Sequence, residues 1–465
     1  MQCPRCQQEN REMYGFSMEY AIRGNRANRT AGACASERTG ARTSRVFLAI
    51  PDLRPAQGVI RLIAIVAMCG LFVLSRPAAE PVHAQISDGI VKIGVLNSDL
   101  GPYVACCGPG SRVAALMAVE DFGTERKGLK VEVVFADHQY RVDVGSAIAR
   151  RWYGDEKVDV IVDVPTSPIT LAVSHIAREK GKALLVSSGG TSDLTGTECS
   201  PNTIHWTYDN WALANSTGKA LVKSGAKTWF LLAVDDAFGR NIEREVEDVV
   251  VENGGKVLGK LRHPLSTSDF SSFLLQAQAS HASVIGLANT GTDLTNAIEQ
   301  GTRLGIVQRG QHFATLLMLI TDVNRLGLNK AQGLMLAEPF YWDMNEQTRA
   351  WSVRFARRHW GAMPTMIQAG VYSAVLHYLK AVETLKSDDG TRVIAKMKAL
   401  PTDDPLFGQG TIREDGRKIH PMYLFEVKKP TESNGPWDLY KLRATIPAAE
   451  AFRPIHRGGC PLVKK

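Results

Sequence analysis

From Val91 onward, short runs of β-branched residues alternate with amphipathic stretches of helical length, which leaves few fold classes open. The alternation is typical of parallel strands that are joined and covered by helices. Strands are expected first at residues 91–96, 130–136, 158–162 and 183–186, with helices at 111–122, 142–153 and 167–180. The pattern then restarts, with helices at 211–223, 240–253, 269–280 and 293–305 around strands at 228–234, 255–261 and 283–288. The predicted fold class is α/β, with two doubly wound Rossmann-like lobes.

The last part of the chain continues this pattern and then departs from it. Strands near 312–319 and 333–336 would complete the second lobe, and helices are expected at 345–360 and 368–384. Residues 410–427 have the pattern of two strands around an Asp415-Gly416 turn. The fold is expected to end with this hairpin.

Residues 61–84 have the pattern of a secretory signal peptide. A cation at Arg61 precedes an apolar run from Leu62 to Leu74, and the segment ends on the small residue Ala84. Export with cleavage after Ala84 is therefore predicted. A permanent membrane anchor is the alternative, but such a helix needs about 20 apolar residues and this run is shorter. Residues 1–60 are interpreted as the product of a start codon placed too early, or as a disordered leader.

Charge and cysteines limit the classes of function. The segment from Met1 to Ala84 holds 11 of the 55 basic and 6 of the 47 acidic residues. The remainder is therefore nearly neutral, and it lacks a basic stretch for nucleic acid. Cys106, Cys107, Cys199 and Cys460 remain in the exported part, and an oxidising compartment allows three pairings. Because adjacent cysteines rarely bridge each other without strain, a Cys199–Cys460 disulfide is predicted.

Polar loops follow several predicted strands. Ligands of such sheets bind beyond the carboxyl ends of the strands, where helix N-termini attract anions. The loops at 163–168 and 187–195 are rich in hydroxyl groups, whereas those at 235–239, 289–293 and 337–343 supply acids and aromatic rings. These loops are the expected binding site.

Three motifs occur in a characteristic order: an opening strand followed by a Gly101-Pro102 loop, a Ser/Thr loop at 187–195 followed by Pro201-Asn202, and the turn Asp236-Ala237-Phe238-Gly239. In these the chain resembles the periplasmic solute-binding proteins of ABC importers, of the type I fold and the leucine/isoleucine/valine-binding group. The resemblance implies two lobes joined by a three-segment hinge. It also implies a periplasmic location, a small-molecule solute, an ABC permease as partner, a monomer and no cofactor.

The resemblance divides the chain into four structural segments. Lobe I would comprise residues 85–208 and 339–403, and lobe II residues 209–338 and 404–465, the last including the C-terminal hairpin and tail. The three hinge crossings are expected near 206–211, 338–342 and 400–405.

The resemblance also places a ligand site. A solute carboxylate would be held by Ser188, Gly189 and Thr191, with Thr166 and Ser167 on the preceding loop. Phe238 would be the aromatic lid, and Asp236 or Glu338 would meet an ammonium group. The full predicted set is Thr166, Ser167, Ser188, Gly189, Thr191, Asp236, Phe238, Thr290, Glu338 and Tyr341. Ser187, Ser188, Thr191 and Asp236 could instead be helix caps, and the aromatic residues at 340–342 could be hinge packing.

The chain departs from the family at residues 103–110, where Tyr103-Val104-Ala105-Cys106-Cys107 makes the pocket edge unusually apolar. Aromatic rings favour stacking with planar solutes, so an aromatic acid and an aliphatic amino acid both remain open as ligands.

Three other classes of function agree less well with the sequence. A hydrolase would need a Gly-x-Ser-x-Gly elbow, which the chain lacks, and Cys107 has no partner at a recognisable spacing. The histidines have no metal-ligand spacing, so no metal is predicted. A ligand-sensing receptor domain of the same fold, without transport, remains the alternative to a transport protein.

Overall fold

A computed structural model describes residues 86–464, which belong to one compact unit of the chain, Glu80–Lys465. The predicted signal peptide at 61–84 and the segment 1–60 lie outside the described residues. Among the helices of 86–464, none is both long and apolar enough to cross a bilayer.

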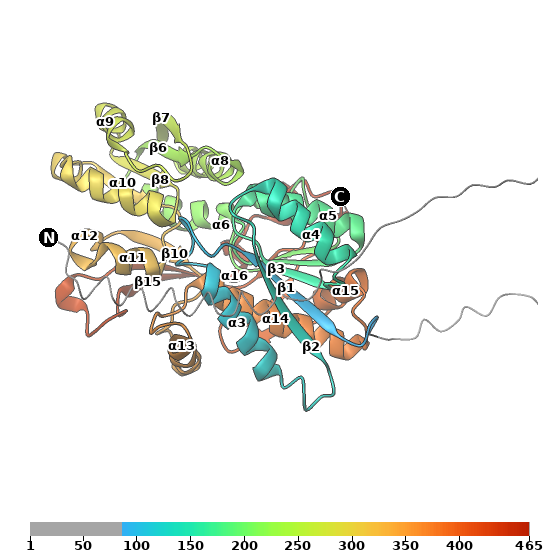
Figure 1. The fold of residues 1–465 in the computed structure, drawn as a ribbon. Coiled ribbons are helices and arrows are strands. Elements are labelled where there is room, and N and C mark those ends of the chain that lie inside the picture. The colour runs from blue at the N-terminus through green and yellow to red at the C-terminus, as the bar shows by residue number, and fades with distance from the viewer. Residues whose placement is uncertain (1–85, 465) are drawn as a thin grey trace, which may run out of the picture. The chain divides into compact units, whose positions relative to one another are not determined.

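The first lobe is built on a five-stranded parallel sheet, in the order β2-β1-β3-β4-β5 (Figure 1). Its strands are β1 Val91–Asn97, β2 Val131–Asp137, β3 Val160–Asp163, β4 Ala183–Val186 and β5 Thr203–His205. Ile93 of β1 pairs with Val133 of β2 on one side and Val160 of β3 on the other. Parallel strands buried on both faces need no alternation of polar residues, which explains their continuous apolar sequences.

Helices cover both faces of this sheet. Their bounds are α3 Gly108–Phe122, α4 Val142–Gly154, α5 Ser167–Lys180, α14 Met366–Leu385 and α15 Gly390–Ala399. Helices α4 and α5 close one apolar core, whereas α3 packs beside α14 on the opposite face (Figure 1). Helices α14 and α15 thus come from a part of the chain that follows the parallel strands of the second lobe.

The second lobe repeats this architecture with a four-stranded parallel sheet, in the order β7-β6-β8-β9. Its strands are β6 Thr228–Val234, β7 Lys256–His263, β8 Val284–Ala288 and β9 His312–Thr315. Its helical segments are α6 Asn210–Leu213, a π-helical turn Ala214–Gly218, α7 Lys219–Lys223, α8 Ala237–Glu252, α9 Ser271–Ala279, α10 Gly291–Arg303, α11 Ile320–Leu326 and α12 Leu328–Ala331. The two doubly wound lobes that the alternation predicted are therefore confirmed.

A third, antiparallel sheet extends the second lobe, in the order β10-β14-β15. Strand β10 is Met335–Glu338, β14 is Met422–Val427 and β15 is Tyr440–Ile446. The tail therefore departs from the expected hairpin. The Asp415-Gly416 turn joins β12 Gly408–Ile412 to β13 Lys418–Ile419, which form a separate small sheet with β11 Thr402–Asp404. Met422–Val427 pairs instead with β10, because its apolar face completes the second core.

The chain passes between the lobes after β5, after β10 and between β13 and β14. The sequence analysis expected these crossings near 206–211, 338–342 and 400–405, and in the structure the last of them is at His420-Pro421. After α13 Glu346–Arg358, α14 and α15, the small sheet stays with the first lobe, where the amide of His205 donates to the carbonyl of Gly416 (2.9 Å). Residue 404 is thus not the start of a second-lobe segment.

The end of the chain returns to the first lobe. After β15 it forms the short helix α16 Ala448–Ala451, and Cys460 is joined to Cys199 by a disulfide, the pairing that the sequence predicted. Their Cα atoms lie 5.6 Å apart, in the usual range for disulfides. This return is a further passage between the lobes, and the predicted disulfide fixes the end of the chain to the first lobe.

Candidate functional site

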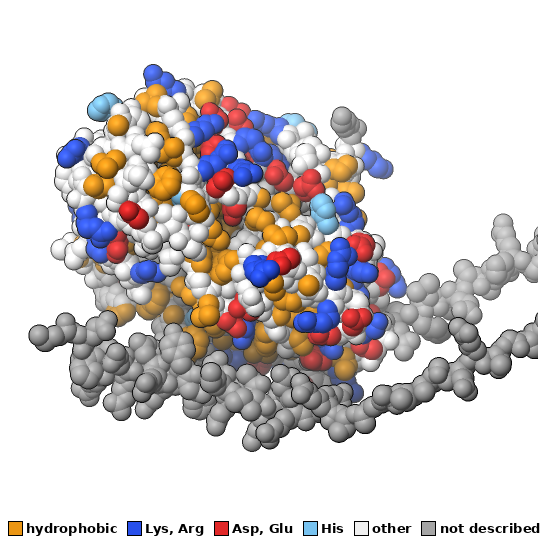
Figure 2. Space-filling view, turned by 45° about the horizontal axis from the view of Figure 1, so that its top comes forward, with side chains coloured by type: hydrophobic (Ala, Val, Ile, Leu, Met, Phe, Trp, Pro, Cys, Tyr) orange, Lys and Arg blue, Asp and Glu red, His pale blue; other side chains and the backbone are white. Residues whose placement is uncertain are grey.

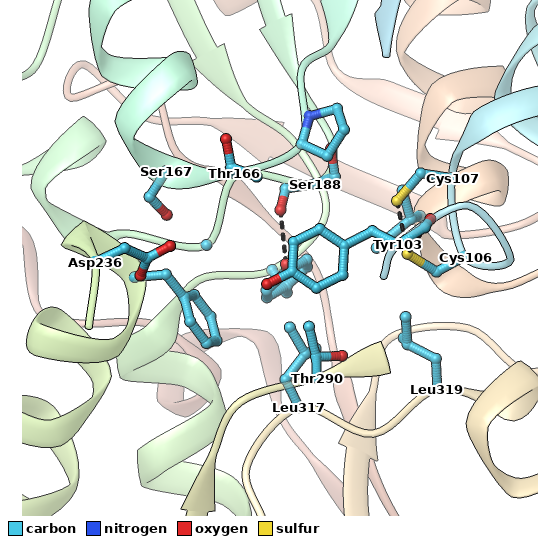
Figure 3. Close-up of a pocket in the computed structure, with 15 residues that line it drawn as sticks. Tyr103, Cys106, Cys107, Thr166, Ser167, Ser188, Asp236, Thr290, Leu317 and Leu319 are labelled. Atoms are coloured by element: carbon cyan, nitrogen blue, oxygen red, sulfur yellow. Dashed lines mark hydrogen bonds between the residues drawn. The ribbon is translucent and has the colours of Figure 1, made fainter. Parts of the chain in front are cut away.

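The carboxyl ends of strands from both lobes border one pocket. Figure 3 shows that its residues converge from both lobes. The first lobe and the adjoining first crossing contribute Tyr103, Cys106, Cys107, Pro165, Thr166, Ser167, Ser188, Gly190, Tyr208 and Ile367. The second lobe contributes Asp236, Phe238, Thr290, Leu317 and Leu319.

The loop after β4 forms a polar wall. Ser188 is held by its carbonyl, which accepts a hydrogen bond from the Tyr208 hydroxyl (2.8 Å). Its own hydroxyl is buried and has no hydrogen-bond partner within 86–464. In that same part of the chain, no hydrogen bond has the amide of Ser188 or Gly190 as its donor. Buried donors without partners are rare, so this wall is suited to an anionic or hydrogen-bonding ligand.

The loop after β3 has a strained backbone. Asp163, Val164 and Thr166 all have positive φ angles in the left-handed region, which non-glycine residues rarely adopt. The conformation is held by the Thr170 hydroxyl, which donates to the carbonyl of Val164 (2.7 Å). Ser167 begins α5, and its hydroxyl accepts the amide of Thr191 (3.1 Å). Strain of this kind is found at functional sites, where the surrounding structure maintains it.

Beneath this loop lies a buried carboxyl group that does not line the pocket. The Asp163 carboxyl group accepts hydrogen bonds from the side-chain amide of Asn97 and from the Ser111 hydroxyl, both at 2.5 Å. Burial raises the pKa of Asp163 to about 6, and these hydrogen bonds oppose the rise. The Asp163 carboxyl group therefore links the end of β3 to β1 and α3 beneath the pocket.

The remaining first-lobe wall is aromatic and apolar. Tyr103 donates its amide to the Tyr140 hydroxyl (3.0 Å), and the two rings meet edge to face at 5.6 Å. Burial raises the pKa of Tyr103 well above its ordinary value, so the ring enters the pocket uncharged. With Tyr208 and Phe238 it provides three rings for one cavity.

The second lobe contributes the only carboxylate among the pocket-lining residues. Asp236 caps α8 by accepting the amide of Gly239 (2.9 Å), and burial raises its pKa. The Thr290 hydroxyl is buried without a hydrogen-bond partner among the described residues. Asp293, on the adjoining helix, is engaged elsewhere because it accepts the amide of Ser266 (3.0 Å).

Of the predicted site residues, the structure brings Thr166, Ser167, Ser188, Asp236, Phe238 and Thr290 to the pocket. Gly189 and Thr191 belong to the same loop after β4 as Ser188, but they do not line the pocket. A Cβ atom on Gly189 would clash with the Thr170 side chain, so this glycine permits close packing on α5. The Thr191 hydroxyl accepts the amide of Asp193 (3.3 Å) and caps the short 3₁₀ helix Ser192–Thr195, which is the structural alternative raised above.

Glu338 and Tyr341 lie away from the pocket. Glu338, at the end of β10, accepts a hydrogen bond from the Tyr440 hydroxyl (3.3 Å). Tyr341 donates to the carbonyl of Trp437 (3.0 Å), and its ring lies 4.8 Å from that of Tyr440. Both residues stabilise the second lobe where the chain leaves it, and for Tyr341 this is the hinge-packing alternative.

Several pocket residues were not predicted: Tyr208, Leu317, Leu319 and Ile367. Leu317 and Leu319 were assigned to a strand over 312–319, but β9 ends at Thr315 and the apolar run continues into the pocket. Asp322 holds this run because its carboxylate accepts the amide of Leu319 (3.0 Å). Ile367 begins a helix in a distant part of the chain, and no local pattern indicates its position. Within 86–464, no group of three or more potential metal ligands occurs.

The family model and the similar proteins that match this chain are all described as binding proteins. A family model described as "Periplasmic binding protein" matches residues 90–435. A crystal structure of a periplasmic binding protein from Burkholderia mallei is 45% identical, with a TM-score of 0.79, over 81% of this chain and 100% of that one. A branched chain amino acid ABC transporter periplasmic ligand-binding protein from Burkholderia xenovorans LB400 is 37% identical, with a TM-score of 0.72, over 80% and 99%. "Leu/Ile/Val-binding protein homolog 6" from Brucella melitensis is 24% identical over 78% of this chain and 93% of its own length.

Proposed function

The chain belongs to the periplasmic binding protein family, and from this premise we propose that it captures a small carboxylic acid between its lobes and delivers it to an ABC permease. The observation that carries the proposal is one pocket, shared by the lobes, that combines unpartnered polar groups with an apolar interior. Such a combination orients one end of a solute and buries the rest.

The carboxylate end would lie against the loop after β4. The amides of Ser188 and Gly190 and the Ser188 hydroxyl can donate to it without a buried cation, whose desolvation would be costly. The body of the solute would fill the space among Tyr103, Phe238 and Leu317. An aromatic carboxylic acid fits this wall best, because ring faces and edges pack favourably against a planar solute.

A branched-chain amino acid is the second candidate, favoured by one observation. Asp236 is the single carboxylate on the pocket wall, and an α-ammonium group needs such a partner. Its two oxygens are not both committed to capping α8, since the Gly239 amide binds Oδ1.

A solute panel tests the function. We expect benzoate, 4-hydroxybenzoate, leucine, isoleucine or valine to raise the melting temperature, because a ligand of the native state stabilises it by roughly 2.7 kcal/mol at 100 times its dissociation constant. If neither these carboxylic acids nor a wider set of organic acids shifts the melting temperature, the proposed ligand class is wrong.

The variant Asp236→Asn separates the two candidates. For an amino acid it should weaken binding by at least about tenfold, because an ammonium group would lose its charged partner. For benzoate the affinity should hold or rise, because a nearby negative charge is removed. Titration calorimetry with leucine and benzoate checks this, and an amino acid bound equally well by both proteins would exclude Asp236 as the ammonium partner.

The remaining steps of the proposal have direct tests. Export predicts a mature protein that begins at Gln85, which intact mass after periplasmic extraction would show. Capture without chemistry predicts that the NMR spectrum of the solute is unchanged after incubation with the protein. Delivery predicts that uptake of the solute into proteoliposomes containing the permease requires this protein, whereas a receptor of the same fold would not support uptake.

A further inference from the structure

Cys106 and Cys107 form an adjacent pair of thiols in the wall of the pocket, and the capture of a solute leaves them without a role. Their side chains lie just before the start of α3 and are exposed by only 5% and 1%. The two Sγ atoms are 2.7 Å apart and face each other in Figure 3. This separation exceeds a disulfide bond by only about 0.7 Å.

The surrounding structure holds both residues in this arrangement. The Thr365 hydroxyl donates to the carbonyl of Cys106 (2.8 Å), and the side-chain amide of Gln368 donates through Nε2 to the carbonyl of Cys107 (3.4 Å). The amide of Gly108 donates to Asn97 Oδ1 (3.0 Å), and its positive φ is a conformation that glycine adopts readily. The thiols are therefore kept together by α14 and β1, and not only by being neighbours in sequence.

We propose that Cys106 and Cys107 are a redox site, which closes to a vicinal disulfide in the pocket wall and reopens under mild reduction. In the oxidation, one thiolate attacks the disulfide of an oxidant, such as glutathione disulfide or a thiol–disulfide exchange protein, and forms a mixed disulfide. The second cysteine then displaces the oxidant. Two protons and two electrons leave the pair and reduce the disulfide of the oxidant, which is released as two thiols. The family compartment is oxidising, and the same chain already contains the Cys199–Cys460 disulfide.

This bond would be labile, unlike the second disulfide. Adjacent Cα atoms are about 3.8 Å apart, below the usual range of about 4.4 to 6.8 Å for a disulfide, and strained disulfides are the easily reduced ones. Burial raises the pKa of both thiols, so exchange should be slow at neutral pH and faster in mildly alkaline solution.

The pair lies at the base of a loop that reaches the second lobe. Cys106 Sγ donates to the carbonyl of Tyr103 (3.1 Å), and the neighbouring carbonyl of Pro102 accepts the amide of Thr292 in α10 (3.4 Å). Oxidation removes the sulfur donor from this loop. The redox state of the pair thus bears directly on a contact between the lobes.

Peptide mapping tests the proposal on the full-length protein. Trypsin should release residues 93–112 as one peptide that contains both cysteines, since Lys92 and Arg112 flank it. After incubation with glutathione disulfide at pH 8 and blocking with iodoacetamide, we expect this peptide to be unalkylated and lighter than its reduced form by two hydrogen atoms. Graded dithiothreitol should then restore two alkylation sites on it before Cys199 and Cys460 become alkylated.

Two outcomes would overturn the inference. The first is a peptide that stays doubly alkylated, or carries glutathione on either cysteine, after prolonged oxidation at pH 8. The second is a pair that resists reduction until Cys199–Cys460 opens. The variants Cys106→Ser and Cys107→Ser are matched controls, because each leaves one thiol in the same site and should give a glutathione adduct or an alkylated cysteine. A thermal unfolding curve of each variant shows that it has folded.

Discussion

At the scale of single residues, two buried hydroxyl groups on the pocket wall stand out. Ser188 and Thr290 come from opposite lobes, and neither hydroxyl has a hydrogen-bond partner among the described residues. A buried polar group without a partner costs free energy, and a solute that satisfies both groups recovers it. The hydroxyls of Ser188 and Thr290 can therefore each form a hydrogen bond with one ligand, from opposite lobes.

Ser188→Ala should weaken binding of the solute by about 1 to 3 kcal/mol, because its hydroxyl would bond a buried carboxylate. Thr191→Ala is the matched control from the same loop. Its hydroxyl caps a short helix, so its loss should lower the free energy of unfolding by about 1 kcal/mol and leave affinity nearly unchanged. Titration calorimetry and urea denaturation of both variants measure the two effects. Equal losses of affinity would contradict the distinction.

At the scale of elements, β13 and the residue before it, Arg417, carry two buried cations beside the hinge. Arg417 Nη1 lies 3.6 Å from Asp209 Oδ2, and Lys418 Nζ lies 3.9 Å from Asp404 Oδ2. Lys418 also lies over the rings of Phe407 (4.1 Å) and Trp206 (4.8 Å). Burial lowers the pKa of Arg417 to about 10 and that of Lys418 to about 8. The hinge therefore contains a charge that is costly to keep near neutral pH.

The stability of the protein should depend on pH through Lys418. Its pKa is lower in the folded than in the unfolded chain, so the folded state bears the full cost of the charge below pH 8. That cost is relieved as pH rises from 8 toward 10.5. Relative to Lys418→Met, the wild type should gain roughly 2 kcal/mol in unfolding free energy between pH 7 and 9.5.

Urea denaturation at both pH values measures this difference, with Lys256→Met on the exposed side of β7 as the control. The control should follow the wild type at both pH values. If the unfolding free energies of the wild type and Lys418→Met change equally between the two pH values, the Lys418 ammonium group is not the cause of the pH dependence.

At the scale of the whole molecule, capture depends on contacts that exist only when the lobes meet. Asn241 of α8 accepts the amide of Ser192 through Oδ1 (3.1 Å), and its Nδ2 donates to Asp193 (3.3 Å). Asn241 does not line the pocket. It is therefore expected to stabilise the closed arrangement and not to touch the solute.

Asn241→Ala should weaken solute binding several-fold without removing any ligand contact, because a smaller fraction of the protein would be in the binding-competent form. Asn253→Ala, at the far end of α8, is the matched control, since its amide bonds only the carbonyl of Val249 in its own helix. Calorimetry gives the affinities, and small-angle scattering should show a more open solute-free Asn241→Ala. An affinity equal to that of the control would argue against this role.

The surface of the described part agrees with a solute-binding role more than with nucleic-acid binding. On the face in Figure 2, Lys and Arg side chains are interspersed with Asp and Glu. Many charged side chains of the described part are paired, as in Arg262–Glu243 (2.9 Å) and Lys330–Glu299 (2.8 Å). Nucleic-acid sites instead gather cations on one face.

The sequence was informative where structure is local. Residues 167–180 and 183–186 were predicted to the residue as α5 and β4, because apolar periodicity and flanking turn residues determine such elements. The short strand β5 and helix α15 were not predicted. Ser188 and Phe238 were predicted from their positions in loops that follow strands, and both line the pocket. Glu338 was predicted from its loop position in the same way, but it lies away from the pocket.

By itself, then, the sequence determined the α/β class, the repetition of the lobe and the loops that form the site, because hydrophobic period and loop chemistry act over short distances. Only the tertiary structure decided which residues of those loops line the pocket. Thr191 turns inward to cap a helix, Glu338 pairs with Tyr440, and Ile367 reaches the pocket from a distant helix. These outcomes depend on packing between segments far apart in the chain, where burial and hydrogen-bond satisfaction select among alternatives that look equal locally.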